Sequence, residues 1–422
     1  MARINLPYGN RLLPITIPDT FLGEVVSPHS VMATSDPEEV IQTALAKPIG
    51  TPPLEQLVKM GQRVAVIIDD ITRETPTCLM LPPLLERLLV AGVSQDDISI
   101  VIALGTHRPL TETEIIKKTG STIANEFEII NIPSRDKNQM VYMGMSSNNI
   151  PAWVNRAVAN ADVRIGLGMI APHMSAGYGG GAKIVLPGVC STKTVDTFHA
   201  READITINQL GSLNSPIRTD LEQFVGERVG LDFIVNVILT RENDLYQCVA
   251  GHFIEAHRAG VRFSQDVYSV MVSKPYPLVI ANAYPGQIDL WQSTKAIWCG
   301  EMMTGNDGTL VLVTESQEGI SNYPFFPHYV GCDPDELKQK LDAGEVKDPK
   351  AAATAICIGR MKRRIKFALV SSGLNQQDAD TMGFSYYESV EEAIAGELKG
   401  PDKNNTIGVM THGGVTLPLL PT

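Results

Sequence analysis

The stretch RVAVIIDD, Arg63 to Asp70, predicts a buried strand of a parallel sheet, because its continuous apolar run ends in two aspartates. ISIVIALGTH, from Ile98 to His107, and ADVRIGLG, from Ala161 to Gly168, have the same form. Between the first two lies PPLLERLLVAGV, where Pro83 suits a first helical turn and Gly92 suits the position after a helix end. The order strand, helix, strand is that of a β-α-β unit.

A second set of strands is expected after residue 275, so the predicted fold class is α/β, with two α/β domains, mostly parallel sheets and the active site in the cleft between them. We expect an N-terminal domain over 1–275 and a C-terminal domain over 276–422, with the last strand free to return to the first. TETE, Thr111 to Glu114, has the form of a capping box and predicts a helix start beyond His107. The second set comprises PLVIAN (277–282), GTLVLVT (308–314), IKFALVSS (365–372) and TIGVMT (406–411), with helices at DPDELKQKL (333–341) and SVEEAIAGEL (389–398).

The composition is that of a globular protein of two or three domains. The 422 residues are 44% hydrophobic and 19% charged, and the net charge of −12 argues against a nucleic-acid partner. No run of 18 apolar residues predicts a membrane span, and charges and prolines interrupt the first 18 residues, where a signal peptide would be apolar. We therefore expect a cytoplasmic protein without membrane or nucleic-acid partners. The six scattered cysteines form no C-x-x-C pair and are expected to be reduced core residues.

Polar segments follow each of the first three strands, where ligands of open α/β sheets bind. They are DDITR (69–73), THRP (106–109) and APHMSAGYGGGAK (171–183). Each residue has a structural alternative, since Asp70 could cap a helix, Arg73 could form a surface ion pair and His107 could be an ordinary loop histidine. Because three successive strand ends carry groups suited to proton transfer or anion binding, their convergence favours a site.

The glycine-rich stretch GGGAKIVLPG, Gly179 to Gly188, is not a P-loop. Ala182 stands where the P-loop has glycine, and Ile184 stands where it has a Mg²⁺-binding hydroxyl. Lys183 must therefore have another role or none.

Two further groups stay open on the residues alone. His199 has no paired metal-ligand spacing and could be structural. Gln292 and Lys295, three apart, share one helix face and could together hold a carboxylate, although a solvated face would look the same.

Taken together, these segments resemble the lactate racemase family from Asn5 to the last strand. The shared motifs are D-x-T-R (70–73), G-x-H-R-P (105–109), H-x-x-A-G-x-x-G-G-x-K-x-V-L-P-G (173–188), K-T…H ending at His199, and Q-x-x-K (292–295). The G-x-G-x-x-G fingerprint of an NAD-dependent dehydrogenase, a rival, is missing after the first strand. A non-catalytic 2-hydroxy acid or sugar-acid binding relative is a second rival, but none of the family's chemical residues is lost.

The resemblance implies a nickel-pincer nucleotide cofactor with Ni(II), pyridinium-3-thioamide-5-thiocarboxylic acid mononucleotide, joined covalently to Lys183. His199 would be a nickel ligand, in a square-planar geometry common for nickel(II). Gly179, Gly180 and Gly181 would let the backbone pass close to the cofactor. Asp70 would position Arg73 or the cofactor. Accessory proteins that make the cofactor are further implied partners.

The reaction implied is inversion at C2 of a small-molecule 2-hydroxy acid by reversible hydride transfer to the cofactor, through a planar 2-keto acid. His107 and His173 match the family's pair of catalytic bases, and imidazole suits a group that accepts and returns a proton. Arg73, Gln292 and Lys295 would hold the substrate carboxylate, Arg73 through two parallel hydrogen bonds.

Departures from the family bear on the substrate. Ala182 replaces an arginine of some relatives, Trp291 precedes Gln292 where lactate racemases have tyrosine, and Ala351 to Thr354 replaces a segment with a pocket tryptophan. Trp291 offers a broad face with an N–H donor, so it would be substrate-binding. We expect a 2-hydroxy acid larger than lactate, such as a sugar acid or a bulkier aliphatic or aromatic hydroxy acid. The alternative is lactate itself.

Overall fold

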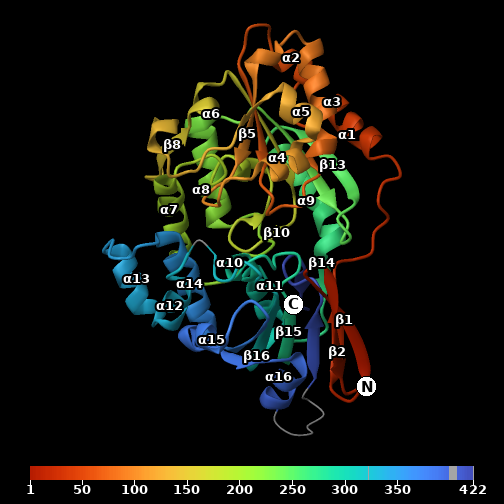
Figure 1. Ribbon diagram of the computed structural model, residues 1–422, viewed down its shortest axis with the longest axis vertical. Coiled ribbons are helices and arrows are strands. Elements are labelled where there is room, and N and C mark those ends of the chain that lie inside the picture. Colours follow the sequence, from red (N-terminus) through yellow and green to blue (C-terminus); the bar gives the residue numbers. More distant parts are fainter. Residues whose placement is uncertain (322, 399–405, 422) are drawn as a thin grey trace.

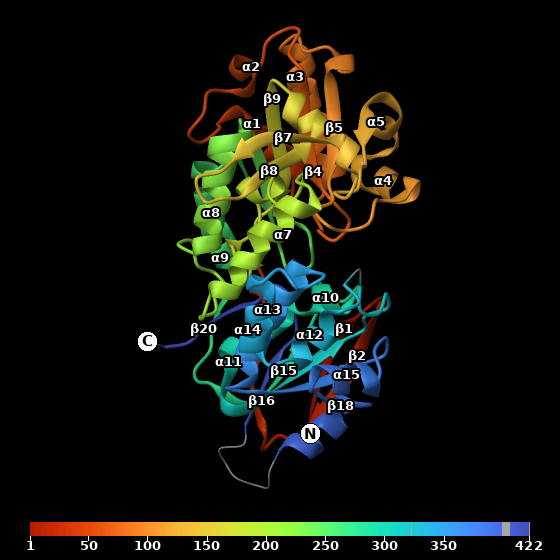
Figure 2. The same ribbon diagram turned by 90° about the vertical axis from the view of Figure 1, so that its left-hand side faces the viewer.

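A computed structural model describes residues 1–321, 323–398 and 406–421 of the chain. The molecule has two lobes, each built on a six-stranded sheet (Figures 1 and 2). This confirms the predicted α/β class with mostly parallel sheets.

The first sheet has the order β13-β12-β9-β4-β5-β6, and only β13 runs antiparallel to its neighbour. All three strands predicted for this region are present and adjacent. Their bounds are β4 (Val64–Asp69), β5 (Ile98–Ala103), β6 (Glu128–Ile130), β9 (Val163–Met169), β12 (Phe233–Leu239) and β13 (Leu245–Gly251).

Both faces of this sheet are buried, as the continuous apolar runs predict. Along β4, Val66 and Ile68 belong to one hydrophobic cluster and Ala65 and Ile67 to another. Since successive side chains of a strand point to opposite faces, helices must cover both. The lobe contains α1 (Pro37–Ala46), α2 (Leu54–Leu57), α3 (Thr77–Val90), α4 (Glu112–Thr119), α5 (Ser121–Glu126), α6 (Arg156–Asn160), α7 (Thr192–Ala200), α8 (Pro216–Phe224) and α9 (Glu255–Tyr268), with short strands β7 (Met140–Met145), β8 (Pro151–Asn155), β10 (Pro172–His173) and β11 (Gly177–Tyr178).

Helix signals in the sequence were partly right. The capping box at Thr111 caps α4, and Gly92 follows the end of α3 with a φ of +92°. The expected start of α3 near Pro83 is wrong, because the helix begins at Thr77 and contains Pro83 in its middle. Its first turns are held by apolar burial, as Met80 is fully buried.

The second sheet has the order β18-β17-β16-β15-β19-β3 and is parallel throughout. All four strands predicted for this region are confirmed, and TIGVMT forms β19 inside this sheet. The elements are β3 (Leu22–Val26), β15 (Tyr276–Asn282), β16 (Thr304–Thr314), β17 (Lys366–Ser371), β18 (Ser385–Tyr387), β19 (Ile407–Met410), α10 (Leu290–Ser293), α11 (Lys295–Met303), α12 (Phe326–Gly331), α13 (Pro334–Asp342), α14 (Pro349–Lys362), α15 (Gln376–Met382) and α16 (Val390–Glu397).

The N-terminal residues lie in the second lobe, unlike the expected 1–275 domain. The hairpin of β1 (Ala2–Tyr8) and β2 (Arg11–Ile17) packs Leu6 into the cluster formed with β15 to β19, and β3 pairs with β19. Figure 1 shows this hairpin beside the lower lobe. After β19, β20 (Leu417–Leu419) pairs with β14 (Ser269–Met271), which lies before residue 275. A boundary at residue 275 therefore separates the strands of the two six-stranded sheets except for β3, which precedes it but belongs to the second sheet.

The cysteine expectation needs correction. All six are free, but Cys78 is exposed and Cys332 and Cys357 are only partly buried. None of the helices in the described part of the chain has both the length and the apolarity to span a bilayer. The cytoplasmic location stays a prediction.

We predict that Leu6→Ala lowers the free energy of unfolding by about 2–5 kcal/mol, because it opens a cavity under the hairpin. Leu12→Ala, on the same hairpin but 61% exposed, should change it by less than about 0.5 kcal/mol. Urea unfolding of both variants checks this. Equal costs would contradict the packing of the hairpin on the second sheet.

Candidate active site

Three neighbouring strand ends meet at one cavity. β9, β4 and β5 are consecutive in the sheet, and the chain leaves β4 for β5 on one side while β9 lies on the other. Such a switch point opens a crevice beyond the carboxyl ends of the strands. The loops at 69–74, 103–107 and 168–174 line the cavity, and residues of α10, α11 and α14 close it from the second lobe.

The structure brings together all but one of the site residues that the sequence singled out. Gly181 does not line the cavity. The residues that do are Asp70, Arg73, His107, His173, Gly179, Gly180, Lys183, His199, Trp291, Gln292 and Lys295.

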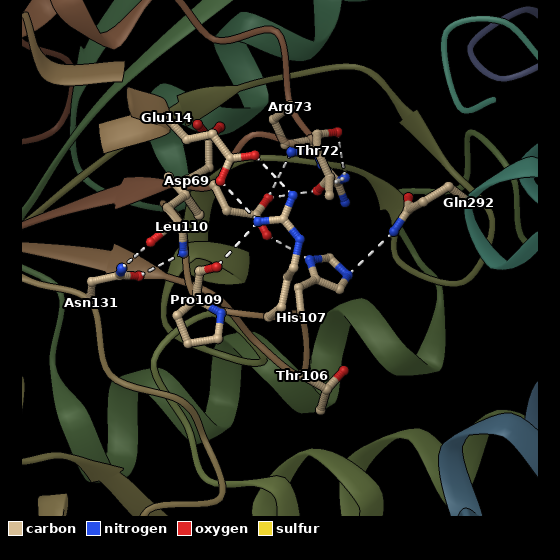
Figure 3. A network of polar contacts seen from close by, with 12 residues as sticks. Asp69, Thr72, Arg73, Thr106, His107, Pro109, Leu110, Glu114, Asn131 and Gln292 are labelled. Atoms are coloured by element: carbon tan, nitrogen blue, oxygen red, sulfur yellow. Dashed lines mark hydrogen bonds and ion pairs between the residues drawn. The ribbon is translucent and has the colours of Figure 1, made fainter. Parts of the chain in front are cut away.

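His107 lies between a carboxylate and an amide (Figure 3). Its Nδ1 donates to Asp70 Oδ2 at 2.6 Å, and its Nε2 lies 3.2 Å from the amide nitrogen of Gln292. Burial raises the pKa of Asp70, but the charge and hydrogen bond of His107 outweigh it, so this pKa lies below its ordinary value. The ionised carboxylate fixes the tautomer in which Nε2 of a neutral ring carries a lone pair.

His173, on β10, faces the cavity with a different support. Its Nδ1 accepts weak contacts from the backbone N–H groups of Ser175 and Ala176 at 3.3 and 3.4 Å. Burial, and then the charge of Lys183, lower its pKa well below the ordinary value. The ring is therefore neutral at pH 7 and able to accept a proton.

Lys183 has the properties of a nucleophilic amine. It lies in a short 3-10 turn, Gly181–Ile184, and burial followed by the charges of Arg218 and Arg73 lowers its pKa to about 7. Half of such amines are unprotonated at neutral pH. Arg218 is fully buried behind the loop, where Nε donates to the carbonyl oxygen of Ala176.

The glycines before Lys183 are required by the protein itself. Gly180 and Gly181 have φ values of +72° and +59°, and a Cβ on Gly180 would lie 2.8 Å from Asn236 Oδ1. The same Asn236 oxygen accepts the Gly181 N–H at 2.8 Å. The need for glycine at position 181 is therefore explained by the close approach of protein atoms rather than of a ligand.

His199, near the end of α7, has one free nitrogen. Its Nδ1 lies 2.7 Å from Glu202 Oε1, and both side chains are at least 94% buried. The buried Nε2 has no hydrogen-bond partner in the described part of the chain. A carboxylate on one nitrogen of an imidazole orients the other toward a ligand such as a metal ion.

No protein cluster could complete a metal site by itself. Among residues 1–321, 323–398 and 406–421, no three His, Cys, Asp or Glu side chains are grouped to hold a metal ion. A metal at His199 would take most of its ligands from a group that is not protein.

The cavity is rich in unpaired positive charge. Arg73, Lys183 and Lys295 form no ion pair within 4 Å among the described residues. Burial, followed by the charge of Arg73, lowers the pKa of Lys295 well below its ordinary value. An anion beside these groups would stabilise their charged forms.

The expectation that Ala351 to Ala353 take the place of a bulky residue in the pocket is wrong. These three alanines are fully buried in the core of the second lobe, and the residues of α14 that line the cavity are Lys350 and Thr354. Trp291 does line it, with its ring centroid 4.4 Å from that of Tyr323 and 5.2 Å from that of Phe326.

The sequence reasoning missed Glu202, Lys350 and Thr354. The spacing of His199 and Glu202, three apart, could have indicated their pairing. No local sequence pattern predicts that Lys350 lines the site, because its hydrogen-bond partner Thr106 is 244 residues away.

Sequence comparisons link the chain to known proteins. Residues 8–209 match the family model of the lactate racemase N-terminal domain. The lactate racemase of Lactiplantibacillus plantarum is 30% identical over 348 residues, which cover 81% of each chain. The lactate racemase of Thermoanaerobacterium thermosaccharolyticum is 28% identical over 421 residues, 98% of each chain.

Two solved structures have the same fold as this chain. The lactate racemase apoprotein from Thermoanaerobacterium thermosaccharolyticum superposes with a TM-score of 0.87 and 25% identity, over 99% of this chain and 100% of that one. A Thermotoga maritima protein has a TM-score of 0.71 at 20% identity, over 91% and 98%, which shows the shared fold.

We predict that Lys183→Met stabilises the cofactor-free protein at neutral pH. In the wild type, the pKa of Lys183 is about 7 and lies below the ordinary 10.5, so the native state binds the ammonium proton of Lys183 less tightly than the unfolded chain does. The resulting cost is full below pH 7 and vanishes as the pH rises to 10.5. Urea unfolding should give the variant an excess free energy of unfolding of about 4–5 kcal/mol at pH 7 that shrinks toward pH 10. The exposed Lys193→Met is the control, and a pH-independent difference would contradict the shift.

Proposed function

The chain belongs to the lactate racemase family, and on that premise we propose that it inverts C2 of a 2-hydroxy acid with the help of a nickel-pincer nucleotide on Lys183. The observation that carries this proposal is one cavity in which the two imidazoles of His107 and His173 accompany cations without a carboxylate partner. A non-catalytic binding protein would need the cations but not the two histidines.

The residues present fit the proposed cofactor, pyridinium-3-thioamide-5-thiocarboxylic acid mononucleotide with Ni(II). Lys183 has a pKa of about 7, which suits an amine that forms a covalent bond, and His199 keeps a buried nitrogen without a partner. Lys183 would hold the nucleotide and His199 the nickel, with Glu202 orienting the ring. When bound, the cofactor would supply reversible acceptance of the C2 hydride.

Arg73, Gln292 and Lys295 would bind the substrate carboxylate. The three line the same cavity, two are cations without a carboxylate partner, and the Gln292 amide already lies beside His107. Arg73 donates to the backbone oxygen and hydroxyl of Thr72 through Nη1, which leaves its other nitrogen atoms available. Binding the carboxylate would place C2 and its hydroxyl near the imidazoles.

His107 and His173 would exchange the hydroxyl proton. The neutral form of one ring takes this proton from one enantiomer as C2 becomes planar in the 2-keto acid, and the imidazolium form of the other ring gives a proton to the oxygen when the opposite enantiomer forms. The Asp70 carboxylate stabilises the imidazolium form of His107, whereas nearby cations favour neutral His173.

We further propose a substrate larger than lactate. Trp291 lines the cavity and offers a large aromatic side chain with an N–H donor, which suits a longer or hydroxylated substrate tail. Sugar acids and bulkier hydroxy acids are the candidate classes, with lactate as the alternative. The accessory proteins that make the cofactor would be its partners in the cell.

We predict that His107→Asn and His173→Asn each slow racemisation by at least about 100-fold, since each base serves one face of the substrate. Chiral chromatography of reactions started from either enantiomer, with cofactor-loaded protein, gives the rates. His328→Asn, an exposed histidine of α12, is the matched control. Wild-type rates in either cavity variant would contradict the two-base scheme.

Lys183→Ala is expected to abolish the covalent mass increase that wild-type protein gains when it is incubated with a cofactor-synthesising extract. Because the side chain lies in a loop rather than in the core, the variant should remain folded by circular dichroism. Intact-mass spectrometry of both proteins checks this. A mass increase that survives in the variant would place the covalent bond elsewhere.

A further inference from the structure

Lys350 is a buried cation that the proposed reaction does not use. It is 7% exposed, on the first turn of α14, and lines the cavity. Its Nζ donates to Thr106 Oγ1 at 3.1 Å and lies 5.1 Å from the ring centroid of Trp291 and 5.4 Å from that of Tyr323. Two aromatic faces and one hydroxyl hold the ammonium in place but do not neutralise it.

No carboxylate of the cavity is free for Lys350. Asp69, Asp70 and Glu202 bind Lys118, His107 and His199 respectively. The fourth carboxylate of the cavity, Glu74, is exposed. Burial raises the pKa of Asp196, on α7, to about 6, and the charge of Lys350 only partly opposes this; the two side chains form no ion pair within 4 Å in the described part of the chain. A buried cation without a counter-charge is costly, so an anion from outside the protein would be strongly favoured there.

A second polar group points to the same ligand. Thr354 is 1% exposed, lines the cavity, and its hydroxyl has no hydrogen-bond partner among the described residues. Residues four apart lie on one face of a helix, so Thr354 and Lys350 present a hydroxyl donor and an ammonium to the same space. This is the donor set of a carboxylate site.

The contacts of Lys350 connect it to the segments that would bind the substrate. Thr106, which anchors Lys350, precedes His107, and Trp291, which lies under the ammonium, precedes Gln292. His107 and Gln292 are in contact with each other. The cation is therefore fixed to the two segments that would hold the reacting end of the substrate.

We propose that Lys350 and Thr354 form a second carboxylate subsite, so that the substrate is a 2-hydroxy acid with a carboxylate at its far end as well. This rests on the proposed racemase function and narrows its substrate to 2-hydroxy dicarboxylates, sugar diacids included. Arg73 and Lys295 would bind the carboxylate next to C2, and Lys350 the distal one.

The test compares charged and uncharged tails of equal shape. Cofactor-loaded wild type, Lys350→Met and Lys347→Met are given 2-hydroxysuccinate and 2-hydroxyglutarate, each beside its terminal amide. In the wild type we expect kcat/KM to be highest for a dicarboxylate. Lys350→Met should lower that value about 30-fold and change the values for the amides by less than about 3-fold, because only the charged tail loses a partner. Lys347, an exposed lysine over the ring of Phe325, is the control and should have no effect.

The outcomes separate the possible errors. Wild-type preference for the amides, or an equal loss for all four acids, would overturn the subsite. An equal loss together with less bound cofactor by intact mass would assign Lys350 to the cofactor phosphate. If no 2-hydroxy acid is racemised, the proposed function fails, and calorimetric binding of the dicarboxylates and their amides to both proteins still tests the subsite. Tighter binding of the dicarboxylates that Lys350→Met abolishes would support it, and its absence would refute it.

Discussion

Uncompensated positive charge is the constraint that shapes the site. Four basic side chains, Arg73, Lys183, Lys295 and Lys350, line one cavity, and none has a carboxylate within ion-pairing distance among the described residues. Taking such charges out of water costs several kcal/mol each, by order of magnitude, unless an anion joins them. The folded state tolerates this desolvation because the remaining contacts of both lobes hold the basic side chains in place. The site is thus organised for anionic ligands before any arrive.

The two imidazoles of the cavity are supported unequally. His107 contacts the carboxylate of Asp70, whereas His173 has only weak contacts with backbone N–H groups and the Ser175 hydroxyl and lies among cations. A carboxylate favours the imidazolium form and cations oppose it. Binding of anionic ligands would weaken that opposition at His173 and so help this ring to take up the substrate proton.

The sequence was informative where one segment determines its own structure. The apolar runs predicted β4, β5 and β9, and their polar ends predicted the convergence of Asp70, His107 and His173 on one cavity. Contacts between distant segments could not be foreseen. The pairing of β3 with β19 and the contact of Lys350 with Thr106 depend on how the lobes are assembled, which no local pattern records. The alanines 351–353 were misread for the same reason, since only packing shows which face of α14 meets the cavity.

The chain enters the second lobe twice, and this sets an order on folding during synthesis. The sheet and helices of the first lobe, from α1 to α9, lie between residues 37 and 268, so that lobe can form as soon as those residues have left the ribosome. The hairpin of β1 and β2 is made earlier but must wait for β15 to β19 before its apolar side chains are covered. Until then Leu6 and Ile17 are exposed on a nascent chain. The protein therefore depends on holding an early segment soluble until the last strands of its sheet are made.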